Sequence, residues 1–319
     1  MMVNRRNVLR TGLASLAAGA LPQVATAAPR RFFGSHRVPL GVQLYTLDAE
    51  LKRDFEGTLR KVAEMGVGVV EIASLHGRSA KQLRHSLKTA GLRPTGLHVP
   101  VAPIPFQDAG LTFANVQQVV EYAQELGVAN VVLPIIQFPA GNRWGETIDI
   151  VRIAREGGGV VSAGTYERMA DFLNELGATL RKNRLRLGYH NHNIEFAPLG
   201  KTTGLEILLA KCDPRLVTFE LDAGWVAAAG LDPAALIRSH PGRFTQMHVK
   251  DIKANPVPDY AFHQHPAEVG SGSLNWPEIL DAAWKNGVRY FYVEQEPPFP
   301  ESPLKSVEKS CAYLKSLWR

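Results

Sequence analysis

The sequence contains little cysteine. Only Cys212 and Cys311 occur among its 319 residues, and both lie in segments that we predict to be helical. A zinc site of the cysteine type needs several thiolates, so this class of site is excluded. We expect both residues to be small, buried, apolar side chains, although an oxidising compartment would permit a disulfide between them.

A strong excess of charge of one sign is also absent. The formal net charge is +6, and Arg5, Arg6 and Arg10 fall in an amino-terminal leader without acidic residues, which leaves about +3 for the rest of the chain. A surface that binds nucleic acid needs clustered lysine and arginine. The sequence therefore argues against nucleic acid as a partner.

No hydrophobic run is long enough to serve as a permanent membrane anchor. The weakly apolar stretch at 11–21 is shorter than the roughly 20 residues that span a bilayer. It follows Arg5-Arg6 and precedes Ala25-Thr-Ala27, an arrangement that resembles a twin-arginine export signal with a small-residue cleavage site. We therefore predict a periplasmic or secreted protein with a signal peptide at 1–27, an extended lead-in at 28–37 and a single folded domain at 38–319.

What the sequence does contain is an alternation of short apolar runs with helical segments, repeated eight times. The runs are apolar throughout, as expected of parallel strands that are buried on both faces. The predicted strands are 38–45, 67–73, 92–99, 128–136, 185–189, 216–221, 244–249 and 290–294. Eight such units favour a (β/α)8 TIM barrel of a single domain. The alternative is an open doubly wound sheet, which would normally carry a ligand-binding turn after its first strand; residues 44–48 offer none.

One long segment interrupts this alternation. Residues 137–165 are rich in glycine and contain one short predicted helix at 146–155. Gly157-Gly-Gly159 lacks the spacing and the flanking residues of a phosphate-binding loop. We interpret it as a hinge or surface loop, or as part of an active-site lid.

Polar side chains gather where four of the predicted strands end. His190, Asp222, His248 and Glu294 lie at the ends of the fifth to eighth strands. Because the carboxyl ends of neighbouring barrel strands meet at one face, we expect these side chains to face one another. Two imidazoles and two carboxylates suit Mn, Co, Fe or Zn better than Mg. The sequence therefore predicts a site for one divalent metal ion.

A metal in this position would polarise a carbonyl group, and a neighbouring base would move a proton on the adjacent carbon. The side chains that we expect to take part in proton transfer are Glu294, Glu195, Lys250 and Glu268. Those that we expect to bind the substrate are Gln43, Glu71, His98, His192, Trp225 and Trp276, with Tyr45 and Trp144 as further aromatic candidates. For each aromatic residue, packing in the core is the alternative.

Five segments carry a resemblance to a known family. They are Tyr189-His-Asn-His192, Glu220-Leu-Asp222-Ala-Gly-Trp225, His248-Val-Lys-Asp251, Glu268-Val-Gly-Ser-Gly272 with Trp276, and Val293-Glu-Gln-Glu296. Through them the chain resembles the sugar phosphate isomerase/epimerase superfamily of xylose isomerase-like TIM barrels, and its Tyr-His-Asn-His form resembles a subgroup whose members are often exported.

The resemblance implies that Asp222, His248 and Glu294 hold the metal. The sequence departs from the family pattern at two positions. The usual glutamate after the fifth strand is replaced by His190, or by His192 if the register shifts, and Trp225 stands where many members have a histidine.

The function that we expect is a sugar isomerase or epimerase that acts on a monosaccharide or an oxidised sugar. A metal-dependent lyase or hydratase acting on a 3-keto-glycoside is an alternative, because isomerisation and elimination share the first proton transfer. The departures at His190 and Trp225 motivate another alternative, a carbohydrate-binding barrel without catalysis. A DNA-repair nuclease of the related barrel type is disfavoured by the leader and by the small net charge. The expected partner is a small sugar, and a homo-oligomer is possible.

Overall fold

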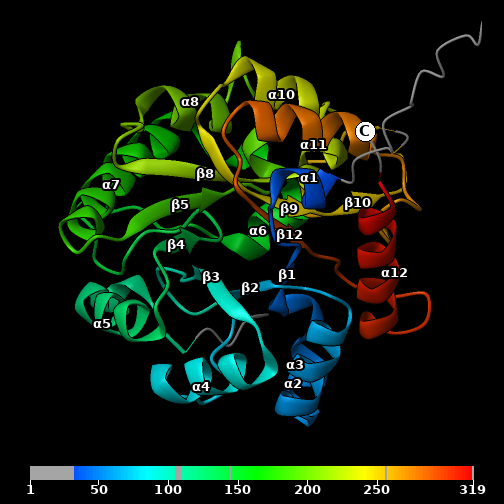
Figure 1. The fold of residues 1–319 in the computed structure, drawn as a ribbon. Helices are drawn as coiled ribbons and strands as arrows, with labels where there is room; N and C mark the ends of the chain where they lie inside the picture. The colour runs from blue at the N-terminus through cyan, green and yellow to red at the C-terminus, as the bar shows by residue number, and fades with distance from the viewer. Residues whose placement is uncertain (1–31, 105–109, 144, 256, 318–319) are drawn as a thin grey trace, which may run out of the picture.

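Eight parallel strands close into a barrel in the computed structural model (Figure 1), which describes residues 32–317 except 105–109, 144 and 256. The order around the barrel is β1-β12-β9-β8-β5-β4-β3-β2. The strands are β1 (Gly41–Gln43), β2 (Val69–Ile72), β3 (Arg93–His98), β4 (Asn130–Leu133), β5 (Arg186–His190), β8 (Val217–Asp222), β9 (Phe244–Val249) and β12 (Tyr290–Val293). The predicted TIM barrel is confirmed, and the closed ring excludes the open sheet.

Helices accompany the barrel strands; most of them lie outside the ring, whereas α1 and α6 lie over its middle (Figure 1). They are α1 (Phe32–His36), α2 (Asp48–Arg53), α3 (Phe55–Glu64), α4 (Ala80–Ala90), α5 (Val116–Leu126), α6 (Ile150–Glu156), α7 (Ala163–Lys182), α8 (Gly204–Lys211), α9 (Ala223–Ala228), α10 (Pro233–Ser239), α11 (Trp276–Lys285) and α12 (Pro303–Ser316). Two small hairpins are added, β6 (Pro198–Leu199) with β7 (Thr202–Thr203), and β10 (Asp251–Ile252) with β11 (Pro266–Ala267).

Several helix ends follow from local sequence. Ser79 and Gln82 form a capping box before α4, and Gly91 ends that helix in the left-handed conformation, which costs glycine little. Asp232 accepts a hydrogen bond at the start of α10, where proline occupies the first turn. Capping side chains satisfy the backbone groups that a helix end leaves free.

Two short helices were not expected from the sequence. In α1, Phe32 and Phe33 pack edge-on against Phe291 of β12, so this part of the predicted lead-in is helical rather than extended. The helix α9 begins directly after β8, where the Asp222 side chain accepts a hydrogen bond of 2.9 Å from the Trp225 N–H. Both helices are stabilised by tertiary contacts, the first by burial of its aromatic rings and the second by a capping carboxylate at a strand end. Such contacts cannot be predicted from the sequence of a short segment alone.

The glycine-rich segment is packed rather than free. The Gly158 N–H donates a hydrogen bond of 2.6 Å to the Tyr260 carbonyl oxygen, and a Cβ atom at Gly158 would lie 2.1 Å from the Ile194 carbonyl oxygen. Gly157 and Gly158 are both buried. Only glycine fits at this contact, so the prediction of a hinge or exposed loop is wrong for these two residues.

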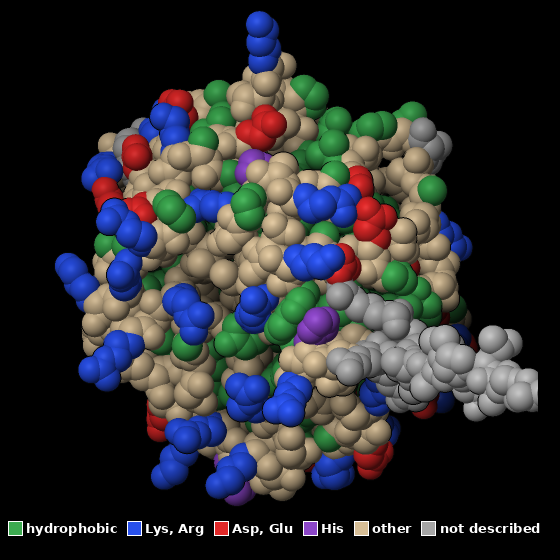
Figure 2. Space-filling model, turned by 45° about the horizontal axis from the view of Figure 1, so that its top comes forward, with side chains coloured by type: hydrophobic (Ala, Val, Ile, Leu, Met, Phe, Trp, Pro, Cys, Tyr) green, Lys and Arg blue, Asp and Glu red, His purple; other side chains and the backbone are tan. Residues whose placement is uncertain are grey.

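The remaining sequence-based expectations concern single features of the chain. Cys212 and Cys311 are free and buried, as predicted. The predicted signal peptide at 1–27 lies outside the described residues. Within the ranges that the structure describes, no helix has the length and apolarity needed to cross a membrane. Lysine and arginine side chains are spread over the face shown in Figure 2 rather than gathered in one groove.

Candidate metal centre

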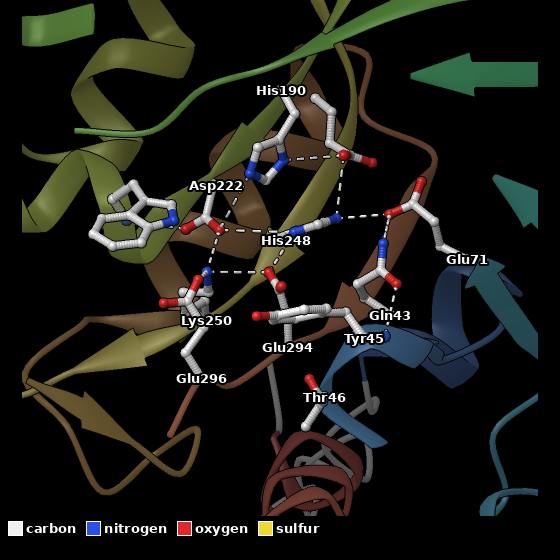
Figure 3. A network of polar contacts seen from close by, with 12 residues as sticks. Gln43, Tyr45, Thr46, Glu71, His190, Asp222, His248, Lys250, Glu294 and Glu296 are labelled. Carbon is white, nitrogen blue, oxygen red and sulfur yellow. Dashed lines mark hydrogen bonds and ion pairs between the residues drawn. The ribbon is translucent and has the colours of Figure 1, made fainter. Parts of the chain in front are cut away.

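The ends of β8, β9 and β12 bring three buried donor side chains together. Ligand atoms of Asp222, His248 and Glu294 lie within 4.8 Å of one another. His248 Nδ1 is 2.6 Å from Glu294 Oε2 and 3.7 Å from Asp222 Oδ2. The side chains converge from neighbouring strands in Figure 3. Their convergence agrees with the position predicted from the strand ends.

His190, at the end of β5, completes this group. Its Nε2 atom lies 3.8 Å from Asp222 Oδ2, while its Nδ1 atom lies 3.1 Å from Glu220 Oε2. One nitrogen of the ring therefore faces the donors and the other faces a carboxylate behind it. The sequence left open whether His190 or His192 belongs to the site, and the geometry favours His190.

The donor set fits a divalent transition metal. It offers two imidazole nitrogens and two carboxylate oxygens, and this mixture is typical of Mn, Co, Fe and Zn sites. Asp222 is fully buried, and its Oδ2 atom lies 2.9 Å from the Lys250 ammonium group. The fit to a divalent metal lies in the types of these donor atoms and in their convergence. We define His190, Asp222, His248 and Glu294 as the candidate metal centre.

Lys250 supplies one cation to this region. Its ammonium group lies 2.9 Å from Asp222 Oδ2, 3.1 Å from Glu294 Oε2 and 3.0 Å from Glu296 Oε1. Burial by itself lowers the pKa of Lys250, but the three carboxylates outweigh burial and raise that pKa well above its usual value. Burial raises the pKa of Glu296 above its usual value.

A second polar layer lies directly behind the candidate metal centre. Glu220 Oε2 is 2.8 Å from His98 Nε2, 3.1 Å from His190 Nδ1 and 3.1 Å from His248 Nε2. Glu71 Oε2 lies 2.7 Å from His248 Nε2. Carboxylates that bind the far nitrogen of a histidine fix its tautomer and orientation. Glu220 therefore orients both imidazoles of the candidate centre.

Two glutamines close this layer and connect the strands. Gln246 donates to Glu71 Oε1 at 3.2 Å and to Glu220 Oε1 at 3.1 Å, and Gln43 donates to Glu71 Oε2 at 3.0 Å. Burial by itself lowers the pKa of His98, yet the charges of Glu71 and Glu220 raise it to about 9. His98 is thus a buried cation between two carboxylates at neutral pH.

A second group of possible metal ligands lies deeper in the barrel. Its ligand atoms, one each from His98, His190, Glu220 and His248, also lie within 4.8 Å of one another. Their separations from Glu220 Oε2 are those of ordinary hydrogen bonds. Glu220 does not line the cavity described next, whereas His190 and Glu294 do. A substrate would therefore reach His98 and His190 of this inner group but not Glu220.

A cavity of about 440 Å³ opens above the candidate metal centre. Its size falls in the range of small-molecule sites in proteins. Its floor consists of polar and charged side chains, namely Gln43, His98, His190, His192, Glu294 and Glu296. Two aromatic rings lie beside His192. The centroid of its ring is 5.4 Å from that of Trp225 and 5.2 Å from that of Phe262.

The structure places most of the predicted substrate-binding side chains on this cavity. Gln43, Tyr45, His98, His192 and Trp225 all line it. His192 is neutral at physiological pH because burial lowers its pKa well below the usual value, and its Nδ1 atom has no hydrogen-bond partner among the described residues. The His192 ring lines the cavity, but this nitrogen is itself buried.

Glu71, which we expected to bind substrate, is completely buried below the cavity, where its carboxylate is already engaged. Trp276 donates its indole N–H to Asp251 Oδ2 at 2.8 Å and does not line the cavity. Both predictions require correction, because these side chains hold the barrel together and do not face a ligand. Trp144 lies outside the described residues.

Two of the carboxylates that we predicted to be catalytic bind other groups of the protein and do not face the cavity. Glu195 accepts hydrogen bonds from the Tyr189 hydroxyl at 2.7 Å and the His192 N–H at 2.8 Å, so it shapes the turn after β5. Burial raises its pKa to about 7. Glu268 contacts Ser306 and Lys309 of α12. Neither lines the cavity, and we correct their assignment as catalytic residues.

Sequence reasoning missed three residues of this region, Glu220, Gln246 and Glu296. Glu220 and Gln246 stand two positions before Asp222 and His248 on the same strands. Side chains two apart in a strand share a face, so this alternation was a usable signal. Glu296 follows the eighth strand, lines the cavity and keeps 26% of its side chain exposed; its position in a loop gave no periodic signal.

Comparison with known proteins places this site in context. A family model described as xylose isomerase-like TIM barrel matches residues 59–317. An inosose dehydratase of Bacillus anthracis is 30% identical over 92 residues, which cover 29% of this chain and 30% of that protein. The chain thus matches less than a third of the length of this curated relative.

Solved structures resemble the chain over most of its length. A sugar phosphate isomerase/epimerase from Parabacteroides distasonis superposes with a TM-score of 0.65 at 25% identity, covering 88% of this chain and 94% of the other. A xylose isomerase-like TIM barrel protein from Mycobacterium smegmatis in complex with magnesium gives a TM-score of 0.60 at 16% identity, with 88% and 96% covered. The second likeness is one of fold alone.

Proposed function

The chain belongs to the xylose isomerase-like TIM barrel family, and on that premise we propose that it is a metal-dependent enzyme that removes a proton from the carbon next to a sugar carbonyl. The observation that carries this proposal is the arrangement at the cavity floor. The candidate metal centre, a lysine ammonium and the partly exposed carboxyl group of Glu296 lie together at the base of one cavity. Isomerase, epimerase and lyase chemistry all begin with this proton transfer.

A divalent ion held by His190, Asp222, His248 and Glu294 would supply a Lewis acid that polarises the carbonyl group. Glu296 would take the proton, because it faces the cavity and burial raises its pKa, which brings a carboxylate closer to the range of an effective base. The Lys250 ammonium, 3.0 Å from Glu296 Oε1, would hold this base in place.

Substrate hydroxyls would find partners on the same floor. The neutral ring of His192 lines the cavity there. Gln43 is less available, because its Nε2 donates to Glu71 and its Oε1 accepts from the Tyr45 N–H. The inosose dehydratase relative is by name a lyase, and the Parabacteroides distasonis structure is by name an isomerase/epimerase. Both reaction classes are therefore part of the proposal.

The first test is the metal content of the purified protein, measured by plasma mass spectrometry. We expect about one equivalent of Mn, Co, Fe or Zn, and a loss of most of it in Asp222→Asn. The matched control is Asp171→Asn on the exposed face of α7, which should retain the metal. Equal metal content in all three proteins would refute the candidate metal centre.

The second test measures removal of the proton next to the sugar carbonyl group. Incubation of an oxo-sugar with the metal-loaded protein in D2O should exchange the hydrogen next to the carbonyl, detected by NMR. Glu296→Gln should abolish exchange and retain the metal, whereas Glu268→Gln should retain both the exchange and the metal. Binding of sugar and metal without exchange on any oxo-sugar would instead support a carbohydrate-binding barrel, the alternative motivated by His190 and Trp225.

We also propose export through the twin-arginine route, supported by the sequence of residues 1–27. Replacement of Arg5 and Arg6 by lysine should leave the full-length precursor in the cytoplasmic fraction. Normal export of that variant would contradict this proposal.

A further inference from the structure

The end of the barrel opposite the candidate metal centre has its own surface. All eight barrel strands run in parallel, so the segments that lead from a helix into a strand lie together at the end where the strands begin. We call this end the amino-terminal face. It consists of residues 37–41, 61–69, 87–93, 123–130, 179–186, 208–217, 236–244 and 282–290, all of which the structure describes.

Positive charge is concentrated on the amino-terminal face. Its basic residues are Arg37, Lys61, Lys88, Arg93, Arg181, Lys182, Arg184, Arg186, Lys211, Arg215, Arg238, Arg243, Lys285 and Arg289. Its acidic residues are Glu64, Glu125 and Asp213. All of the basic side chains are exposed except that of Arg243, which is partly buried. Because the formal net charge of the whole chain is only +6, the acidic residues lie mainly on the rest of the molecule, which is therefore electrically polarised.

Most of these cations have no counter-charge on the protein. Among the described residues, the ion pairs of this face involve Lys211, Arg215, Arg238 and Lys285. The other lysine and arginine side chains of the face form no ion pair with a described carboxylate. Their positive potential is not cancelled locally and extends into the solvent.

Stabilisation of helix ends explains a part of this pattern. Helices end on the amino-terminal face, and a cation in the last turn interacts favourably with the helix dipole. Lys61, Lys88, Lys211 and Lys285 are cations of this kind. The helix dipole does not account for the arginines in loops and at strand starts, namely Arg37, Arg93, Arg184, Arg186, Arg215, Arg243 and Arg289. This second set indicates a requirement for positive charge on the face itself.

The most basic part of the face contains a cavity of about 410 Å³ between the starts of β5 and β8. Three arginines line it together with Leu185, Pro214, Leu216 and Thr218, and no acidic side chain does. Arg181 donates to the Arg215 carbonyl oxygen at 2.9 Å, and Arg215 in turn pairs with Asp213 at 2.6 Å. The third arginine, Arg186, makes no side-chain hydrogen bond or ion pair with a described residue. Guanidinium groups bind phosphate through paired hydrogen bonds, so this cavity suits a phosphate group.

From this distribution of charge we propose that the amino-terminal face docks on an anionic phospholipid surface. Its cations stand on separate loops around the ring, which fits an extended plane of phosphate groups, and each cation near such a plane adds to the attraction. A nucleic acid strand is instead held along one basic groove. Docking by this face would leave the cavity above the candidate metal centre open to small molecules. The inference goes beyond the proposed function, because it uses no residue of the candidate metal centre.

The test is co-sedimentation of the full-length protein with vesicles of phosphatidylcholine, with and without one quarter of phosphatidylglycerol. We expect binding only to the vesicles that contain phosphatidylglycerol. High salt should abolish this binding, because salt screens exposed charges. The segment at 1–27 is itself basic, with Arg5, Arg6 and Arg10, so variants have to show that the amino-terminal face is responsible.

The diagnostic variant combines Arg93→Glu, Lys182→Glu and Arg186→Glu. All three side chains are exposed and lack an ion pair with the described residues, so their replacement should leave the fold intact. An unchanged circular-dichroism spectrum and thermal unfolding curve verify this. We expect the affinity for anionic vesicles to fall at least about tenfold.

The matched control combines Lys81→Glu, Lys201→Glu and Lys253→Glu. These side chains are also exposed and lack an ion pair with the described residues, but they lie at the opposite end of the barrel, in segments that follow a strand. Both variants change the net charge by the same amount. The control should change the affinity for anionic vesicles by about twofold or less.

Each of the other outcomes would overturn the inference. Absence of binding to anionic vesicles would do so directly. Equal losses in the two variants would attribute binding to net charge, and unchanged binding in the diagnostic variant would attribute it to the segment at 1–27. Tighter binding of a double-stranded DNA fragment than of the vesicles, weakened by the diagnostic variant alone, would identify the face as a nucleic-acid surface instead.

Discussion

The floor of the cavity and its aliphatic wall are built in different ways; the wall consists of Ile104, Pro134, Ile135, Ile150, Val151 and Ala154. The floor side chains stand at or just after the ends of barrel strands and are joined by hydrogen bonds and ion pairs, such as those of Glu294 with His248 and Lys250 (Figure 3). The wall stands on α6 and on loop residues, and its side chains carry no hydrogen-bonding group. A charged network loses much when one member is removed, whereas an exposed apolar surface tolerates change.

This difference has a functional meaning within the proposal. The barrel strands give the metal centre a fixed geometry, since their register sets which side chains face one another. The loops that follow the strands are the variable part of such barrels. The floor would then determine the chemistry, and the loops would determine which substrate is accepted.

The largest effect is expected from Lys250→Met. The change removes the buried cation between Asp222, Glu294 and Glu296, so it should lower the free energy of unfolding by about 3–5 kcal/mol in the presence of a chelator. Divalent metal should restore part of that loss, because it brings a cation to the same carboxylates. Denaturant unfolding with and without metal measures both.

The control for this variant is Lys285→Met, which removes an exposed lysine paired with Asp281 on α11. It should change stability by less than about 1 kcal/mol. A Lys250→Met protein as stable as the parent would show that the floor is not held by this cation.

The pH dependence of stability should report His98. Its pKa is raised to about 9 in the folded protein, above the ordinary value of 6.5, so the folded state binds the proton more tightly than the unfolded state. The stabilisation is therefore complete below about pH 6.5 and is lost as the pH rises through about 9. Relative to His98→Gln, the metal-free protein should lose on the order of 3 kcal/mol across this window. Parallel stability curves would contradict the charged His98.

Glu220→Gln should weaken metal binding by about 10–100-fold, the usual cost of removing a carboxylate that orients a histidine ligand. The amide has the same shape but cannot accept equally well from His190 and His248. Competition with a chelating dye measures the affinity. Glu268→Gln is the matched control, since Glu268 is buried but does not contact the centre. Equal affinity in the two variants would limit Glu220 to a packing role.

The smallest effect is expected from Val151→Ser on the wall. Because Val151 is exposed and belongs to no polar network, both stability and metal affinity should stay within about 0.5 kcal/mol of the parent. The same unfolding and dye measurements apply. A marked loss of metal affinity would show that the wall and the floor are coupled, which would break the comparison drawn above.

The sequence predicted the fold well because its signals are local. Each strand is a short apolar run, and helix ends such as Ser79 with Gln82, Gly91 and Asp232 are marked by capping residues. It also predicted that His190, Asp222, His248 and Glu294 converge, because strand ends in a barrel share one face. The assignments of Glu71, Glu195, Glu268 and Trp276 failed, because the hydrogen-bonding groups of these side chains bind partners within the fold and not a ligand.

By itself, the amino-acid sequence determined the order of strands and helices and the residue types at each strand end. Only the tertiary structure decided which nitrogen of His190 faces the donors, which carboxylates lie behind them, and that α6 supplies an aliphatic wall. The physical reason is the distance along the chain over which each interaction acts. Hydrophobic period and capping act within a few residues, whereas the Glu220–His98 and Lys250–Glu296 contacts join segments 122 and 46 residues apart and exist only once the barrel has closed.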